Sequence, residues 1–354
     1  MTSQSTAVIC FQLGGPDSLD AVEPFLYNLF SDPDIFDFPG SSLFGKPLAR
    51  WISKNRAPHA AEHYAAIGGR SPIRELTDRQ AAALQVSLHA AGADAKVFVA
   101  MRYWHPMTDA VIQQVKQGGF TQIVLLPLYP QFSQSTTLSS VNEWRRQAML
   151  SGLDVPTKLI CCYPNHPSMI DAVVANINET YLRFSGVDPK DIELVFSAHG
   201  VPLSYIKRGD PYQLQIEETV RAVVARGRWT SPHRLAYQSK VGPQKWLQPA
   251  LTDIVEELLR QGRRRILIVP IAFVTEHIET LHEINIELRE EAEHLGVKQL
   301  EMMPALNDHP LFIKCLTDLV TARMRSSGPQ TSKCMRLWEG TSAREKPVLC
   351  PWME

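Results

Sequence analysis

The sequence predicts an α/β protein with two four-stranded parallel sheets, each flanked by helices. Three observations lead to this fold class: short and almost continuously apolar runs recur, each ends in a turn containing Gly or Pro, and an amphipathic helical pattern follows the turn. Such strands, when they alternate with helices, are typical of parallel sheets covered on both faces. Eight of these units could form one closed barrel or two doubly wound halves, and we favour two halves.

The eight expected strands divide evenly between the halves. They lie at residues 7–12, 96–101, 122–127 and 157–162 in the first half, and at 193–198, 234–239, 265–271 and 299–303 in the second. The clearest helical patterns lie at residues 72–91, 168–181, 212–226, 252–261 and 276–294. We expect an N-terminal half at residues 1–165, a C-terminal half at 166–308, and a helix at 309–325 that packs back on the first half.

Residues 28–57 interrupt this alternation, because they mix large apolar side chains with Lys and Arg. We interpret the segment as an insertion at the mouth of a cleft, an apolar lip that admits a ligand or rests on a membrane surface. The alternative is a helix packed in the ordinary core. Residues 326–354 are rich in Ser, Gly, Pro and charge and lack periodicity, so we expect a loosely ordered tail.

The composition excludes several classes of protein. Of the 354 residues, 44% are apolar and 21% are charged, and the net charge of −1 gives no broad basic surface for nucleic acid. No apolar run is long enough to predict a membrane-spanning helix, and six scattered cysteines do not suggest a disulfide framework. The segment Gly14-Gly15-Pro16 lacks the third glycine or Lys-Ser/Thr of nucleotide-binding loops. We therefore expect a cytoplasmic protein that binds neither nucleic acid nor nucleotide.

The least generic residues follow the predicted strand ends. Because the carboxyl ends of parallel strands share one edge of the sheet, where ligands bind in such folds, we expect these residues to line a cleft. Together they supply aromatic rings, histidines, an arginine and carboxylates, which suits a large flat apolar ligand with charged edges. The segments concerned lie at residues 13–17, 101–106, 127–133, 197–202, 238–243 and 273–279.

His199 is the first candidate for chemistry, because it stands beside Gly200 where a predicted strand becomes a turn. A neutral imidazole there could accept a proton or ligate a metal. From spacing alone, a histidine that only hydrogen-bonds within its turn is the commoner outcome, and that alternative remains open.

A line of carboxylates is the second candidate. Glu279, Glu283 and Glu287 recur at i, i+4 and i+8 of a predicted helix, and Glu276 and Glu290 extend nearly the same face. Like charges at this spacing repel by a few tenths of a kcal/mol per pair, and a transient divalent cation bound by oxygen ligands would compensate. The alternative is a solvated acidic face, but Glu279 follows a strand end and should point into the cleft.

Three further side chains could hold a ligand's carboxylates. The guanidinium groups of Arg56 and Arg102 suit that geometry, although either could equally serve in an internal salt bridge. Ser71 could donate a hydrogen bond to a ligand or cap the helix that starts at Pro72.

At this point several motifs, in order along the chain, resemble those of ferrochelatases of the bacterial type. The most specific are Ser-Ala-His-Gly-Val-Pro at 197–202, Gly-Asp-Pro-Tyr at 209–212 and His-Ile-Glu-Thr-Leu-His-Glu at 277–283. Further matching stretches lie at 13–17, 64–73, 101–106, 127–137 and 238–246, so the resemblance covers about residues 7–325.

The resemblance implies a chelatase-like fold of two Rossmann-like halves with the porphyrin between them. It implies an enzyme, a lyase of haem biosynthesis, that inserts Fe(II) into protoporphyrin IX in the last step and releases two protons. By motif, His199 and Glu279 match the catalytic and metal-binding pair, and Arg56 and Ser71 match contacts to the porphyrin propionates. A route for metal and protons would use His277, Glu276, Glu283 and Glu287, and the porphyrin pocket would use Leu13, Tyr64, Arg102, Tyr103, Tyr129, Trp246 and Phe273.

The resemblance also bears on cofactors and partners. Animal members hold a [2Fe–2S] cluster on closely spaced cysteines, whereas here the internal position is Gln134 and the tail offers only Cys334 and Cys350, so no resident cofactor is expected. Peripheral contact with the inner membrane would run through residues 28–57. Two alternatives remain, a ferrochelatase acting on coproporphyrin III and a non-catalytic porphyrin or haem carrier, which would not need the line of carboxylates.

Overall fold

The computed structural model describes residues 5–35, 41–239 and 244–326 of the chain. Its strands form two four-stranded sheets in the orders β2-β1-β3-β4 and β6-β5-β7-β8. Every pairing in both sheets is parallel. The prediction of two doubly wound halves is therefore confirmed, and the closed barrel is excluded.

The first sheet contains all four strands predicted for it. They are β1 (Thr6–Gln12), β2 (Ala95–Met101), β3 (Gln122–Pro127) and β4 (Thr157–Leu159). The associated helices are α1 (Val22–Phe30), α2 (Ser41–Ala66), α3 (Ile73–Ala90), α4 (Thr108–Gly118), the π-helix η1 (Gln134–Leu138) and α5 (Ser139–Ser151). Strand β4 is shorter than predicted, because its register with β3 ends at Leu159.

The second sheet likewise contains its four predicted strands. They are β5 (Glu193–His199), β6 (His233–Gln238), β7 (Arg265–Pro270) and β8 (Gln299–Met302). Between and around them lie α6 (Pro167–Tyr181), the 3-10 turn η2 (Pro189–Asp191), α7 (Leu203–Lys207), α8 (Tyr212–Gly227), α9 (Leu251–Arg260), the π-helix η3 (Glu279–Leu288), α10 (Arg289–Leu295) and α11 (Pro310–Arg325).

One predicted element is wrong in kind. Residues 276–294 were expected to form a single α-helix, but Glu279–Leu288 is a π-helix and only Arg289–Leu295 is α-helical. Since a π-helix closes its hydrogen bonds at i→i+5, its backbone is wider than an α-helix, and such segments occur frequently at functional sites. A shorter π-helix, η1, follows β3 of the first half, as η3 follows β7 of the second.

The strands are buried as their composition requires. Every residue of β1 is buried, and so is every residue of β3. One apolar cluster extends from the first sheet to the second, through side chains such as Val8, Phe196 and Phe312, and includes the fully buried Leu84 and Leu88 of α3. Burying a leucine contributes about 1.5–3 kcal/mol, so this shared core holds the two halves together.

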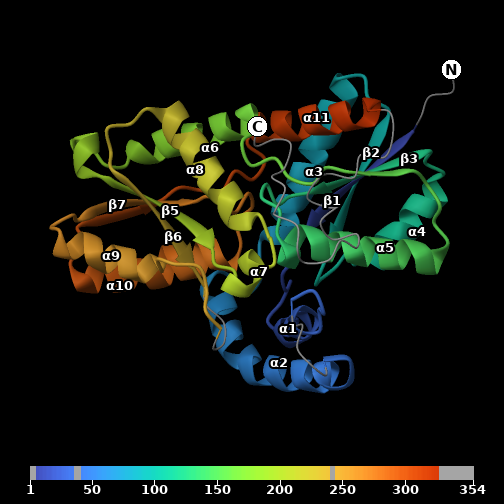
Figure 1. Cartoon of the computed structure of the whole chain (residues 1–354), viewed down its shortest axis with the longest axis horizontal. Helices are drawn as coiled ribbons and strands as arrows, with labels where there is room; N and C mark the ends of the chain where they lie inside the picture. The colour runs from blue at the N-terminus through green and yellow to red at the C-terminus, as the bar shows by residue number, and fades with distance from the viewer. Residues whose placement is uncertain (1–4, 36–40, 240–243, 327–354) are drawn as a thin grey trace.

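Figure 1 shows the two halves side by side, with the carboxyl ends of both sheets directed toward the middle of the molecule. Helix α11 lies along α3 and α6 on the upper side, while α1 and α2 project from the lower side. The end of β1 contacts the loop that follows β7, where Gln12 donates to the Thr275 hydroxyl at 3.3 Å. Across the three described stretches, no helix combines the length and the apolar character needed to cross a membrane.

The segment interpreted as an insertion, residues 28–57, falls on the end of α1 and most of α2. One side of these two helices is buried in a cluster that includes Phe25, Phe30 and Tyr64. The other side is exposed, and Trp51 keeps 66% of its accessible surface. We refer to α1 and α2 together as the lip.

Candidate functional site

His199 and Glu279 meet where the second sheet ends. His199 is the last residue of β5 and Glu279 is the first residue of η3. The imidazole Nδ1 lies 3.1 Å from the carboxylate Oε2, and the two side chains keep 34% and 24% of their surface exposed. The pair is therefore within hydrogen-bonding distance and still accessible to a ligand.

The end of β5 is fixed by contacts around His199. The hydroxyl of Tyr212 donates to the His199 carbonyl at 3.0 Å, and the Gly200 amide donates to the Gln238 carbonyl at 2.8 Å. A Cβ at Gly200 would lie 3.1 Å from the Ser239 carbonyl oxygen, which is closer than most real contacts, so glycine allows β5 and β6 to end this close together.

A second imidazole approaches the same carboxylate. His277 Nδ1 lies 3.0 Å from the carbonyl oxygen of Thr275, and its Nε2 lies 3.6 Å from Oε2 of Glu279. Because the carbonyl can only accept a hydrogen bond, Nδ1 carries the proton and Nε2 faces Glu279. Glu279 is thus flanked by two histidines.

These contacts set the acid–base character of the site. Burial alone would raise the pKa of Glu279, but the neighbouring His199 and His277 outweigh it and hold that pKa below its ordinary value. Burial alone would lower the pKa of each histidine, but Glu279 outweighs it and raises both pKa values. The carboxylate is therefore ionised, and His199 is a stronger base than a free imidazole.

The carboxylate line leads from the buried pair to the surface. Ser239 donates to Glu283 at 2.8 Å, and burial, followed by the charge of Glu279, raises the pKa of Glu283 to about 7. Glu287 keeps 61% of its side chain exposed and lies 4.0 Å from Nδ1 of His282. Glu279, Glu283 and Glu287 thus follow one another outward along η3.

Glu276 departs from this line. One of its carboxylate oxygens accepts a hydrogen bond from the Thr280 hydroxyl, and the other accepts from the Ala305 amide at 2.7 Å. Both oxygens are engaged inside the fold, and the residue is buried. A role for Glu276 in metal or proton transfer stays a prediction, while its described contacts tie two loops together.

Aromatic rings surround the histidines. The ring of Trp246 lies 6.4 Å from that of His199, as does the ring of Phe273, which is also 4.5 Å from His277. Tyr64 of the lip is buried, and its pKa is raised by burial and then by Glu279 and Glu283, which places it near the carboxylates. The predicted wall residue Tyr129 is buried at a distance from this group, beside Ser140 in the core of the first half.

Arg102 and Tyr103 are engaged within the protein. Arg102 lies 3.0 Å from the carboxylate of Asp32 and donates to Ser139 at 2.8 Å, while the Tyr103 hydroxyl donates to Asp32 at 2.6 Å. The contacts favour the internal salt bridge that the sequence left open for Arg102. The sequence analysis did not identify Asp32. It could have been sought only because a buried arginine needs a carboxylate partner.

The other predicted porphyrin contacts lie on the first half. Leu13 follows β1 and packs against the lip cluster, and the guanidinium of the exposed Arg56 lies 5.5 Å from the centre of the Phe30 ring. Ser71 accepts a weak 3.4 Å hydrogen bond from the Ile73 amide, so it serves the start of α3. A Cβ at Gly15 would lie 2.6 Å from Ser71, so only glycine permits the two loops to touch.

Metal ligands are few in this region. Within the described part of the chain, no group of three or more His, Cys, Asp or Glu side chains is arranged to hold a metal ion. Cys10, Cys161, Cys162 and Cys315 are buried. The tail cysteines considered in the sequence, together with the expectation of a loosely ordered tail, lie outside the described residues.

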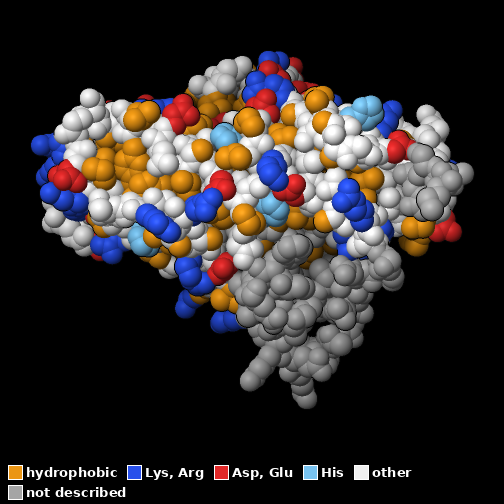
Figure 2. Space-filling model, turned by 90° about the horizontal axis from the view of Figure 1, so that it is seen from above, with side chains coloured by type: hydrophobic (Ala, Val, Ile, Leu, Met, Phe, Trp, Pro, Cys, Tyr) orange, Lys and Arg blue, Asp and Glu red, His pale blue; other side chains and the backbone are white. Residues whose placement is uncertain are grey.

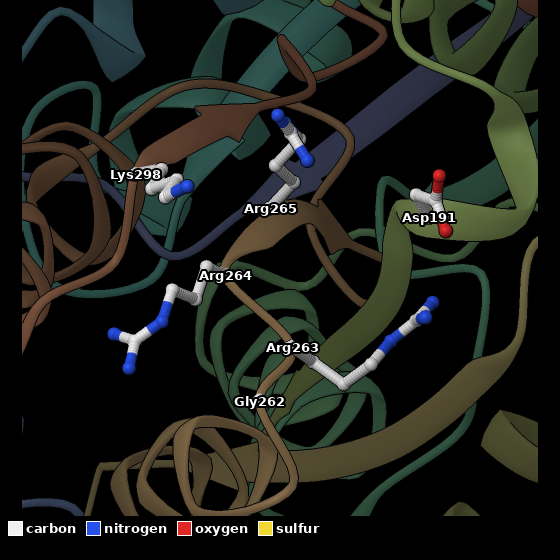
Figure 3. A pocket seen from close by; sticks show the side chains of 6 residues that line it. All are labelled: Asp191, Gly262, Arg263, Arg264, Arg265 and Lys298. Atoms are coloured by element: carbon white, nitrogen blue, oxygen red, sulfur yellow. The ribbon is translucent and has the colours of Figure 1, made fainter.

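A small basic pocket of about 260 Å³ lies at the start of β7, far from His199 (Figure 3). Figure 2 shows Lys and Arg scattered over the visible face, with Asp and Glu among them. Two of its cations are already engaged, since Arg263 donates to Glu193 at 2.8 Å and Arg264 donates to the Gly296 carbonyl at 2.7 Å. The residues that line the pocket are Asp191, Gly262, Arg263, Arg264, Arg265 and Lys298.

Comparison with known proteins gives a consistent picture. The family model described as ferrochelatase matches residues 5–324. The chain is 43% identical to a ferrochelatase of Cyanothece sp. over 93% of this chain and 85% of that protein, and 46% identical to one of Geobacter metallireducens over 90% and 98%. Among solved structures, SirB from Bacillus subtilis with Fe3+ has a similar fold, with a TM-score of 0.54 and 13% identity over 91% of this chain and 97% of that one.

Proposed function

This chain belongs to the ferrochelatase family and is an enzyme that inserts Fe(II) into protoporphyrin IX to make protohaem, and we propose that His199 and Glu279 carry out this reaction. The observation that carries the proposal is their 3.1 Å contact at the carboxyl end of the second sheet. A base and an ionised carboxylate side by side are what the exchange of two protons for a dication requires.

His199 and Glu279 have different roles in this reaction because their charges differ. Glu279, whose pKa is held low, offers a permanent negative charge to Fe(II). His199, whose pKa is raised, is the better proton acceptor. It takes a proton from one pyrrole nitrogen, passes it outward to Glu283 and then takes the proton of the second pyrrole nitrogen, so that both protons leave as Fe(II) enters. A carboxylate oxygen can bind a divalent cation without holding it tightly, which suits a metal that is substrate and must be released to the porphyrin nitrogens.

Glu283 and Glu287 extend the site outward. With a pKa of about 7, Glu283 can gain and lose a proton at neutral pH, so it relays protons from the pair toward the exposed Glu287. The same carboxylates draw Fe(II) inward along η3. His277 keeps Glu279 ionised throughout.

The macrocycle must bend before its pyrrole nitrogens can exchange protons for metal. Apolar walls from both halves can hold this strained form with binding energy remote from the reacting centre. We place Leu13 and Tyr64 on one side and Trp246 and Phe273 on the other, with Arg56 and Ser71 toward the propionates.

The decisive experiment compares Glu279→Gln with the wild-type enzyme in anaerobic insertion of Fe(II) or Zn(II) into protoporphyrin. We expect kcat to fall by about 10²-fold or more, because the metal loses its charged partner, while porphyrin affinity stays within a few-fold. The control is Glu290→Gln on the neighbouring helix. Normal insertion by Glu279→Gln would refute the mechanism. Porphyrin binding without any insertion by the wild type would favour the carrier, and preferred turnover of coproporphyrin III would mean that coproporphyrin is the substrate.

The lip supplies a contact for a membrane-soluble substrate. Its outer side exposes Leu48 and Trp51 among the basic Arg50 and Lys54, a pattern that suits the surface of an anionic bilayer. This supports an enzyme of the cytoplasm that touches the inner membrane peripherally. Neither a resident cofactor nor a [2Fe–2S] cluster is part of the proposal.

A further inference from the structure

Gln80 is a buried amide that joins the two halves near the catalytic pair. It lies on α3 of the first half with only 1% of its surface exposed. Its Nε2 donates to the carbonyl oxygens of Val274 at 3.2 Å and Asn307 at 2.9 Å, and its Oε1 accepts from the Thr275 hydroxyl at 3.1 Å. Both N–H groups and the carbonyl of the amide are thus engaged by the second half.

The partners of Gln80 lie on two loops. Val274 and Thr275 belong to the loop between β7 and η3, and Asn307 belongs to the loop between β8 and α11. The Asn307 side chain accepts from the Glu276 amide at 3.1 Å. The two loops are therefore bonded to each other and both are fastened to α3.

Thr275 is the point where two amides of the first half converge. Besides donating to Gln80, its hydroxyl accepts from Nε2 of Gln12, at the end of β1, at 3.3 Å. The Thr275 backbone carbonyl is in turn the 3.0 Å partner of His277 Nδ1, and this contact turns Nε2 of His277 toward Glu279. A continuous path of contacts runs from Gln80 through Thr275 and His277 to Glu279.

Helix α3 connects this path to the predicted propionate contact. It begins at Ile73, two residues after Ser71, and Gln80 follows two turns later on the same rigid element. At 1.5 Å per residue, the seven steps from Ile73 to Gln80 rise about 10 Å. One helix therefore links the predicted propionate contact to the loop that carries the catalytic residues.

We propose that Gln80 is a positioning residue that sets the catalytic loop against the porphyrin-holding half. The proposal rests on the proposed function and adds a residue that touches neither porphyrin nor metal. When the amide is lost, the Asn307 carbonyl loses this partner, the Val274 carbonyl keeps only the Asn307 amide at 2.8 Å, and the Thr275 hydroxyl keeps only Gln12. The loop is then no longer fastened to α3 and shifts. Displacements of about 1 Å at reacting groups can reduce turnover by about 10²-fold.

Gln85 provides a matched control on the same helix. Its Nε2 donates to the Ala95 carbonyl at 2.7 Å and its Oε1 accepts from the Val97 amide at 2.8 Å. These contacts bind α3 to β2 within the first half. Gln85→Leu therefore removes a comparable side-chain amide without touching the catalytic loop.

The experiment measures kcat, KM for protoporphyrin and the thermal midpoint of wild-type protein, Gln80→Leu and Gln85→Leu under anaerobic conditions. For Gln80→Leu we expect kcat to fall about 10- to 100-fold, KM to stay within about threefold, and the pH profile of kcat to shift. For Gln85→Leu we expect a lower midpoint with kcat near that of the wild type.

A second pair of variants covers the case in which Gln80→Leu does not fold. Thr275→Val removes the hydroxyl with little change in shape, and Thr275→Ser keeps it. We expect Thr275→Val to lower kcat and Thr275→Ser to restore most of it.

The outcomes separate this inference from the proposed function. If Gln80→Leu and Gln85→Leu lose activity equally, if Gln80→Leu changes KM alone, or if Thr275→Val is as active as Thr275→Ser, the positioning role is wrong and the function stands. If the wild-type protein inserts no metal, or Glu279→Gln is fully active, the proposed function falls first and the positioning role falls with it.

Discussion

At the scale of single residues, the environment of Glu283 differs strongly from that of a free carboxylate. Burial and the neighbouring Glu279 raise its pKa from 4.5 to about 7. The folded protein therefore keeps a proton on Glu283 between these two values, whereas the unfolded chain has already lost it. Stability contributed by this group is present at acid pH and is lost as pH rises from about 4.5 to about 7.

The corresponding prediction concerns Glu283→Gln, which is neutral at every pH. We expect the variant to gain about 1–2 kcal/mol of unfolding free energy over the wild type at pH 8, and to show no gain at pH 4.5. Urea denaturation in metal-free buffer at both pH values measures the difference. A gain that is equal at the two pH values would show that the pKa is not raised, and the exposed Glu287→Gln is the control.

A second residue-scale prediction concerns the buried carboxylate of Asp32. It binds Arg102 and Tyr103 of the first half. It lies just after α1, separated from the helix by the C-cap residue Ser31. Removing one partner of a buried pair leaves an uncompensated charge, which typically costs about 3–5 kcal/mol.

We therefore expect Asp32→Ala to lower the thermal midpoint by several degrees. The double variant Asp32→Ala with Arg102→Leu should lose less than the sum of the single changes, because the stranded charge is removed. Strict additivity, or an unchanged midpoint in Asp32→Ala, would contradict the account.

At the scale of elements, η3 is where the sequence and the structure diverge. The i, i+4, i+8 spacing of the glutamates indicates a helix, but it does not distinguish α from π, because both geometries keep such residues near one face. What widens the backbone is the surroundings of Glu279, whose side chain meets His199 and whose carbonyl accepts from Gln238 at 3.2 Å. Those partners come from β5 and β6, more than forty residues away.

A prediction at this scale concerns membrane binding by the exposed side of the lip. Trp51 is 66% exposed on α2 near several basic side chains. We expect Trp51→Ser together with Lys54→Glu to weaken binding to vesicles that contain anionic lipid, since each basic group near such a surface contributes about 1 kcal/mol. Sedimentation with vesicles measures it, and Leu182→Ser, at an 80% exposed leucine away from the lip, is the control. Equal vesicle binding by the wild type, the double variant and Leu182→Ser would contradict a membrane contact through the lip.

At the scale of the whole molecule, the two halves repeat one plan. Their strand orders correspond one to one, and both place a π-helix after the third strand. Phe11 pairs with Pro127, the last residue of β3, and Ser197 pairs with Pro270, the last residue of β7. Two residues onward, Leu13 and His199 occupy equivalent positions, so one half presents an apolar side chain where the other presents an imidazole.

This arrangement predicts how ligand and stability are linked. A porphyrin that contacts both halves binds only when they are folded and correctly placed, so it stabilises the native state by mass action. At a free concentration 100 times its Kd, protoporphyrin should add about 2.7 kcal/mol and raise the thermal midpoint. The rise should persist in Glu279→Gln, which keeps the walls. A midpoint that does not respond to porphyrin would argue against a site between the halves.

The sequence by itself determined the alternation of strands and helices, because apolar runs and turn residues act locally and leave few topologies open. It also determined the family, since the motifs at the strand ends are specific. Glu279 emerged from periodicity, whereas His199 depended on resemblance. The interpretation of residues 28–57 as an insertion at a cleft mouth stays a prediction.

Only the tertiary structure decided which polar groups meet. Arg102 and Asp32 are 70 residues apart, and Gln80 and Thr275 are 195 apart, and no local pattern encodes such pairs. The same holds for the pKa values of His199, Glu279 and Glu283, which depend on burial and on the charges that folding brings near. Sequence therefore supplies the candidate residues, while their ionisation, their partners and the π-helical backbone beneath them follow from contacts between distant segments.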